Sequence, residues 1–177
     1  MKIMALDVAT VTGFAVGTVG EVPISGALRF AERGAPPVRV WFKAMVWMHE
    51  QLKVHQPDVV YMEGAINSAS LGGKSNPSTF ILLNGLQAVL STVVEARLPV
   101  SAKTIAVSTV RKRFLGKGNL RSEDAKPMAK AKCIELGWVD DEATFDQCDA
   151  LGVWAAACEI EHSLNPKRAI KAQAVEA

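Results

Sequence analysis

The chain has 177 residues, of which 49% are hydrophobic and 21% charged, and its formal net charge is +2 at pH 7. These values are ordinary for one globular domain with a buried core. The three cysteines are an odd number without C-x-x-C spacing, which argues against a disulfide framework and a cysteine zinc site and favours a reducing, cytoplasmic setting. We see no signal-peptide pattern, and residues 75–94 include too many polar side chains to predict a membrane span.

The first 30 residues predict three short strands, over residues 2–9, 13–19 and 23–30, joined by tight turns into an antiparallel meander. The first strand is almost wholly apolar but carries Asp7 in its middle. A buried ionised carboxylate is costly unless it is paired or binds a metal. The alternative is that Asp7 caps the turn that follows.

An amphipathic helix is predicted next, because apolar residues recur at a 3-4-3-4 spacing, at Val38, Trp41, Met45, Met48 and Leu52. Residues 58–63 then predict a fourth strand that ends on Glu63. Since this strand follows a helix, we expect it to run parallel to the first strand through a crossover.

The second half of the chain predicts mostly helices. We expect helices over residues 78–96 and 107–115, with a short strand over 99–104 between them. A further helix begins at Ser122 or Asp124, either of which is a suitable N-cap, and has Pro127 in its first turn. The last helix opens at Thr144, where Thr-x-x-Gln is a capping-box pattern. Residues 1–162 are predicted to form the domain and residues 163–177 a C-terminal tail.

Positive charge is concentrated in one segment. Between Arg97 and Lys132 there are ten Lys or Arg and two acids, so this segment carries +8 and the remainder of the chain −6. Such an asymmetry indicates a polyanionic partner for one face, the alternative being a solvated helical surface.

Four acids lie where the predicted elements would bring them together. Asp7 lies in the first strand and Glu63 ends its parallel neighbour, while Asp146 and Asp149 are three residues apart at the start of the last helix. Clustered carboxylates repel one another unless cations intervene, and hard divalent ions such as Mg²⁺ prefer oxygen ligands. Taken singly, the last three acids also have ordinary explanations as loop, helix-dipole or surface residues.

The order of these motifs resembles the RuvC-like Holliday-junction resolvases of the RNase H-like superfamily. The matching segments are LD and TGFAV in residues 6–16, VVYME in 59–63, VR and LGKGN in 110–119, and DQCDALG in 146–152. The resemblance implies an α/β, RNase H-like fold with a five-stranded mixed sheet, three strands antiparallel and two parallel, flanked by helices. It also implies a homodimer that nicks opposed strands of a four-way DNA junction.

The same resemblance implies the site. Asp7, Glu63, Asp146 and Asp149 would be the catalytic residues and the metal ligands, holding two Mg²⁺ ions for which Mn²⁺ can substitute. The basic side chains expected to contact DNA phosphates are Lys74, Arg111, Lys112, Arg113, Lys117 and Arg121. Of these, Lys112 and Lys117 are predicted to assist catalysis.

The sequence also departs from the family pattern. No aromatic residue follows Glu63 until Phe80, and Ser122 stands near the place of an expected basic residue, beside Arg121. Both differences favour action on branched DNA more broadly than on four-way junctions alone. A phage or prophage origin, with activity in the cytoplasm of a bacterial host, is a further hypothesis.

Three other functions are alternatives for this sequence. Residues 68–75, SASLGGKS, resemble a phosphate-binding loop but begin with Ser68 instead of glycine. An actin-like or sugar-kinase-like fold also bears an aspartate in its first strand, but it needs two such domains and this chain is too short. A nuclease relative that binds junctions without cutting them is the third.

Overall fold

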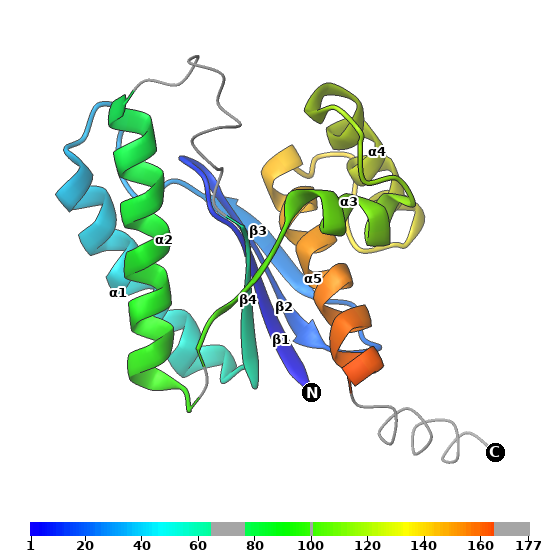
Figure 1. The fold of residues 1–177 in the computed structure, drawn as a ribbon, viewed down its shortest axis with the longest axis horizontal. Helices are drawn as coiled ribbons and strands as arrows, with labels where there is room; N and C mark the ends of the chain where they lie inside the picture. Colours follow the sequence, from blue (N-terminus) through cyan, green and yellow to red (C-terminus); the bar gives the residue numbers. More distant parts are fainter. Residues whose placement is uncertain (65–76, 100, 165–177) are drawn as a thin grey trace.

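A five-stranded mixed sheet forms the centre of the computed structural model, which describes residues 1–64, 77–99 and 101–164 (Figure 1). Its strand order is β3-β2-β1-β4-β5. The antiparallel strands are β1 (Lys2–Asp7), β2 (Thr12–Thr18) and β3 (Ile24–Leu28). The strands β4 (Val59–Glu63) and β5 (Lys103–Ile105) run parallel to β1. This arrangement confirms the predicted five-stranded mixed sheet, although β5 is shorter than the strand expected over residues 99–104.

Helices cover both faces of the sheet (Figure 1). One layer contains α1 (Pro37–His55) and α2 (Pro77–Arg97), and the other contains α3 (Val107–Leu115), α4 (Ser122–Glu135) and α5 (Phe145–Leu164). Side chains alternate between the faces of β1: Met4 and Leu6 pack in the core beneath α1 and α2, and Ile3 and Ala5 in the core beneath α5. A strand buried on both faces must be apolar throughout, which explains the composition of β1.

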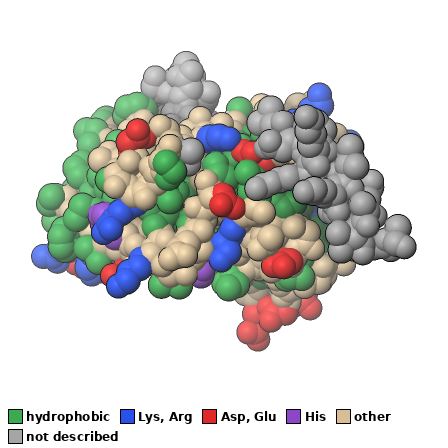
Figure 2. Space-filling view, turned by 90° about the horizontal axis from the view of Figure 1, so that it is seen from below, with side chains coloured by type: hydrophobic (Ala, Val, Ile, Leu, Met, Phe, Trp, Pro, Cys, Tyr) green, Lys and Arg blue, Asp and Glu red, His purple; other side chains and the backbone are tan. Residues whose placement is uncertain are grey.

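The helix α2 is long and apolar enough, by length and composition alone, to cross a membrane. It packs beside α1, and its residues Leu86, Leu90, Val93 and Val94 are buried in the core of that layer. Figure 2 views the end of the sheet where the N-terminus lies, and shows hydrophobic side chains gathered on the side of α1 and α2 and mixed charges elsewhere on the described part of that face.

The start of α4 differs from the prediction. Arg121 occupies the N-cap without a side-chain hydrogen bond to the helix, so neither Ser122 nor Asp124 is the cap. Pro127 lies beyond the first turn, inside the helix, where it has no N–H to donate to the carbonyl of Glu123. The helix tolerates this because its buried face is held by packing, through the small side chains of Ala125, Ala129 and Cys133.

The helix α5 is fixed at both ends. Thr144 caps it as predicted, accepting a hydrogen bond from the Gln147 backbone N–H at 3.2 Å. The Gln147 side chain does not complete the capping box, because it donates to Ser25 Oγ at 3.0 Å and thereby ties the helix to β3. Near the other end, the buried Glu161 accepts hydrogen bonds from Tyr61 Oη at 2.7 Å and Lys103 Nζ at 2.6 Å, on β4 and β5.

A glycine lets α5 approach the sheet. Gly13 on β2 lies opposite Asp7 of β1, and a Cβ atom at residue 13 would overlap the backbone carbonyl of Asp146. The first turn of α5 therefore rests directly on the backbone of β2, one strand away from Asp7. Gly13 thus sets the distance between the acid of β1 and the acids of α5.

We expect Gly13→Ala to lower the free energy of unfolding by about 1–3 kcal/mol or more, because the methyl group must push the first turn of α5 off the sheet. Denaturant unfolding followed by circular dichroism measures this change. Gly64→Ala is the matched control, since its Cβ would lie 3.5 Å from the nearest atom, the Ile105 carbonyl oxygen, at ordinary contact distance. Equal stability of the two variants would contradict the close packing at Gly13.

Candidate active site

The carboxyl ends of β1 and β4 place two acids side by side. Asp7 is the last residue of β1, which ends two residues earlier than predicted, so Asp7 lies at the end of the strand and not in its middle. Glu63 is the last residue of β4, and the parallel register pairs Leu6 with Met62 immediately before these two acids. Adjacent strands are about 5 Å apart, so both carboxylates leave the sheet at the same point. The sheet topology alone therefore accounts for half of the acidic cluster.

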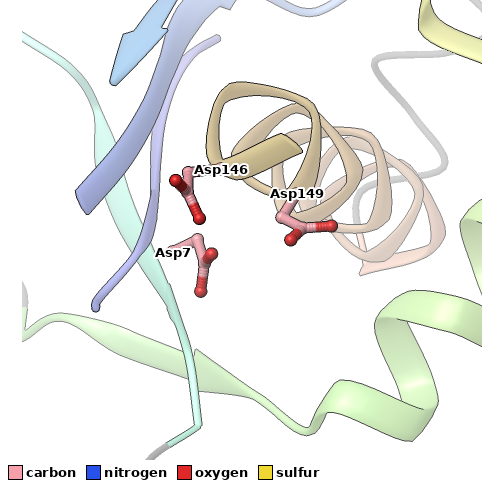
Figure 3. Close-up of side chains that lie close together, drawn as sticks. All are labelled: Asp7, Asp146 and Asp149. Carbon is pink, nitrogen blue, oxygen red and sulfur yellow. The ribbon is translucent and has the colours of Figure 1, made fainter. Parts of the chain in front are cut away.

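The N-terminus of α5 supplies the other two acids. Figure 3 shows Asp146 and Asp149 on the first turns of α5, turned toward Asp7. One carboxylate oxygen from each of Asp7, Asp146 and Asp149 lies within 4.8 Å of the others. Glu63 lines the same cavity, which has a volume of about 210 Å³. The structure thus places all four predicted acids around one cavity.

Burial and mutual repulsion raise the pKa values in this cluster. Burial, reinforced by the charges of Glu63 and Asp149, raises the pKa of Asp7 to about 8. Burial and then the charge of Asp149 raise the pKa of Glu63 to about 7, although Arg111 and Lys126 oppose the change. The pKa of Asp149 is also raised, first by burial. Asp7, Glu63 and Asp149 therefore resist being ionised together unless positive charge enters the cavity.

Lys126 of α4 brings one such charge into the cavity. Its Nζ lies 3.2 Å from Asp149 Oδ2 and 3.7 Å from Asp146 Oδ1. Burial lowers the pKa of Lys126, but the charges of Asp149, Asp146 and Asp7 together outweigh burial and raise it, so the ammonium stays charged. The sequence reasoning counted Lys126 only within the basic segment. Its spacing from Ala129 and Cys133, which are buried on the same side of α4, is the signal that would have placed it at the site.

The predicted DNA-binding residues are distributed more widely than the acids. Arg111 lines the cavity and donates to the Leu120 carbonyl and, at 2.9 Å, to Ser122 Oγ. Arg113 pairs with Glu159 at 3.1 Å on the outer side of α5.

The remaining predicted basic residues lie away from the acids or beyond the described chain. Arg121 is exposed and lies 3.6 Å from Glu123. Lys112 and Lys117 are exposed, and neither is among the described residues that line the cavity. Lys74 and the phosphate-loop-like segment 68–75 lie outside the described residues.

The donor set fits a hard divalent cation. All four acids offer carboxylate oxygens. One oxygen from each of Asp7, Asp146 and Asp149 is close enough to the other two for the three acids to share one ion. Mg²⁺ and Mn²⁺ prefer such ligands, and a cation would relieve the repulsion that raises the pKa values of Asp7 and Glu63. Asp7, Glu63, Asp146 and Asp149 are therefore the residues that would hold the metal.

We expect the stability of the metal-free protein to fall as pH rises from about 4 to about 8. The unfolded chain releases the protons of Asp7 and Glu63 near the lower end of this range, at their ordinary pKa values of 3.8 and 4.5, while the folded protein retains them up to about pH 8 and 7. A bound cation removes this penalty, so Mg²⁺ should raise the Tm more at pH 8 than at pH 5.5.

Calorimetry or dye-monitored melting measures both effects. Asp7→Asn should flatten the pH dependence and reduce the Mg²⁺ shift, whereas Asp141→Asn, an exposed acid outside the cavity, should behave as wild type. A Mg²⁺ shift that is the same in both variants would remove Asp7 from the cation site.

Comparison with known proteins places the fold. No family model and no curated protein sequence matches the chain. The chain is similar to the structure of Thermus thermophilus RuvC, with a TM-score of 0.64 at 15% identity over 96% of this chain and 97% of that one. It is similar to T. thermophilus RuvC in complex with Holliday junction substrate, with a TM-score of 0.68 at 14% identity over 88% and 92% of the two chains. For the yeast mitochondrial Holliday junction resolvase Ydc2 the TM-score is 0.63 at 11% identity, over 97% and 83%.

These similarities are structural, and the identities of 11–15% carry the fold alone. They extend over 88–97% of this chain, so they concern the arrangement of the sheet and its helices as a whole. They do not bear on a phage or prophage origin. The chain has a RuvC-like fold.

Proposed function

We propose that this protein is a metal-dependent endonuclease that hydrolyses phosphodiester bonds in four-way or branched DNA. The observation that carries the proposal is the convergence of Asp7, Glu63, Asp146 and Asp149 on one cavity. Support comes from the fold, which resembles that of a RuvC bound to a Holliday junction substrate. Resolution would be by paired nicks that leave a 5′-phosphate and a 3′-hydroxyl, as the sequence resemblance implies.

In the proposed reaction, the bound cations and the protein side chains have different roles. When bound, Mg²⁺ or Mn²⁺, as two ions in the proposed site, supplies activation of water and stabilisation of the leaving oxygen. The four acids bind and orient the cations. Lys126 and Arg111 line the same cavity and add fixed positive charge next to the position of the phosphate. The apolar side chains of Val110 and Phe114 form part of the wall of this cavity.

The segment from Arg97 to Lys132 provides the proposed DNA contacts. It includes α3 and α4, which lie on the same side of the sheet as the acidic cavity (Figure 1). Its charge of +8 suits backbone phosphates, giving binding that depends on salt and little on sequence. A homodimer would present two such sites to opposed strands of one junction, and this assembly is part of the proposal.

Labelled four-way junction and linear duplex, incubated with Mg²⁺ and with chelator, test the proposal. We expect paired, Mg²⁺-dependent nicks in the junction, lost by at least a hundredfold in Asp7→Asn and Asp149→Asn because the cation site loses charge. Asp141→Asn should cleave as wild type. A wild-type protein that binds the junction but leaves it uncut with Mg²⁺ and Mn²⁺ would favour the non-cleaving relative instead.

A second experiment identifies the basic side chain that assists catalysis. Lys126→Met should lower the single-turnover cleavage rate about tenfold or more with little loss of junction affinity, because its ammonium lies at the acids. Lys112→Met and Lys117→Met should weaken binding at moderate salt and leave the single-turnover rate at saturation nearly unchanged. If Lys112→Met and Lys117→Met instead lower the single-turnover rate and Lys126→Met mainly weakens binding, then Lys112 and Lys117 are the residues that assist catalysis.

A further inference from the structure

A second cavity lies next to the acidic one. It has a volume of about 380 Å³ and is formed mainly by the connection from β3 to α1, residues 29–35, with Thr10, Val40, Leu82 and Leu86 completing its walls. The side chains of Phe30 and Leu86 in its wall are buried in the core beneath α1 and α2. Nothing in the proposed chemistry uses this cavity.

The two cavities are separated by one segment of backbone. Ala9 lines the acidic cavity and Thr10 lines the second one. Consecutive Cα atoms are 3.8 Å apart, so the cavities open on either side of the chain where it leaves β1. Both therefore lie at the end of the sheet where β1 and β4 terminate, with α5 on one side and the β3–α1 connection on the other (Figure 1).

Two arginine side chains line the second cavity. All three arginines of the first 96 residues fall within residues 29–39, and two of them, Arg29 and Arg33, line the cavity with exposed side chains. The acid of this connection, Glu32, pairs with the third arginine, Arg39, at 3.0 Å, so its charge is offset. The guanidinium fork matches the oxygens of a phosphate group, which makes this rim suitable for a phosphodiester.

We propose that Arg29 and Arg33 bind backbone phosphates of the same DNA molecule, within a few nucleotides of the bond that is cut. The DNA would cross the acidic cavity, with α3 and α4 on one side and the β3–α1 connection on the other. The contact is to phosphate, so it adds affinity and fixes the path of the strand without reading sequence. This inference rests on the proposed function, because it places the DNA by the acidic cavity.

The test compares junction binding by two double variants, both in an Asp7→Asn background that prevents cleavage. Arg29→Ala/Arg33→Ala removes the two cavity arginines. Lys43→Ala/Lys53→Ala removes the same charge from exposed positions on α1 outside both cavities, and so controls for long-range electrostatics. Fluorescence anisotropy with labelled four-way junction, at fixed Mg²⁺ and at 50–250 mM KCl, gives Kd and its salt dependence.

We expect the arginine variant to bind about tenfold more weakly at low salt, and the slope of log Kd against log salt to fall by about 1–2, the value for one or two lost phosphate contacts. The lysine variant should change neither quantity by a comparable amount. Arg29→Lys/Arg33→Lys, which retains charge but not the guanidinium fork, should recover most of the slope and only part of the affinity.

Two failures are distinguishable. If the arginine and lysine variants bind alike while the parent binds the junction in a salt-dependent way, the second cavity takes no phosphate and the proposed function stands. If the parent shows no salt-dependent binding of the junction, the proposed function itself fails. Melting curves of each variant establish that it is folded, so a lost contact is separated from a lost structure.

Discussion

The repulsion among buried carboxylates is the constraint on which the rest of this structure depends. Asp7 and Glu63 leave neighbouring strands at the same point, and α5 adds Asp146 and Asp149 to the same cavity. Burial disfavours the charges of Asp7 and Glu63, and the negative charges near them raise the free energy further. A fold that builds such a cluster loses stability by doing so, which is the expected signature of a site maintained for chemistry.

The protein holds this unfavourable cluster in place by anchoring α5 firmly. Gly13 lets the first turn of α5 lie against β2, and the Gln147 side chain ties the same turn to Ser25 of β3. At the far end, Glu161 joins the helix to β4 and β5 through Tyr61 and Lys103. Because both ends are fixed to the sheet, the acids of α5 cannot move apart to reduce their repulsion.

The helix α4 partly offsets this repulsion, because it brings positive charge to the acids. It projects Lys126 onto Asp149 and Asp146, which partly neutralises the cavity. Arg111 of α3 lines the cavity too, while its guanidinium fixes the connection to α4 through Leu120 and Ser122. The basic segment, which holds ten of the twenty Lys and Arg residues of the chain, therefore also supplies part of the wall of the acidic cavity, and this joins phosphate attraction and cation binding in one place.

The sequence by itself determined the order of the elements and the identity of the acids. The apolar runs of β1 and β4, the stripe of α1 and the capping threonine of α5 are local patterns that depend on neighbouring residues alone, and the structure confirms them. Sequence patterns also singled out Asp7, Glu63, Asp146 and Asp149, because a carboxylate in or beside an apolar segment is costly unless a partner or a metal ion offsets its charge. The boundaries of β5 and the cap of α4 were wrong because short elements there are fixed by packing instead of by local preference.

Only the tertiary structure decided which positive charges meet those acids. The sequence does not distinguish between Lys112, Lys117 and Lys126, because all three are lysines of the same basic segment. Lys126 reaches the cavity because α4 packs against α5 with Ala125 and Ala129 inward, which directs the adjacent lysine at Asp149. The cavity at Arg29 and Arg33 likewise exists only once β1, β3, α1 and α2 are assembled. Distances between residues far apart in the chain follow from packing, and no local pattern of residues encodes them.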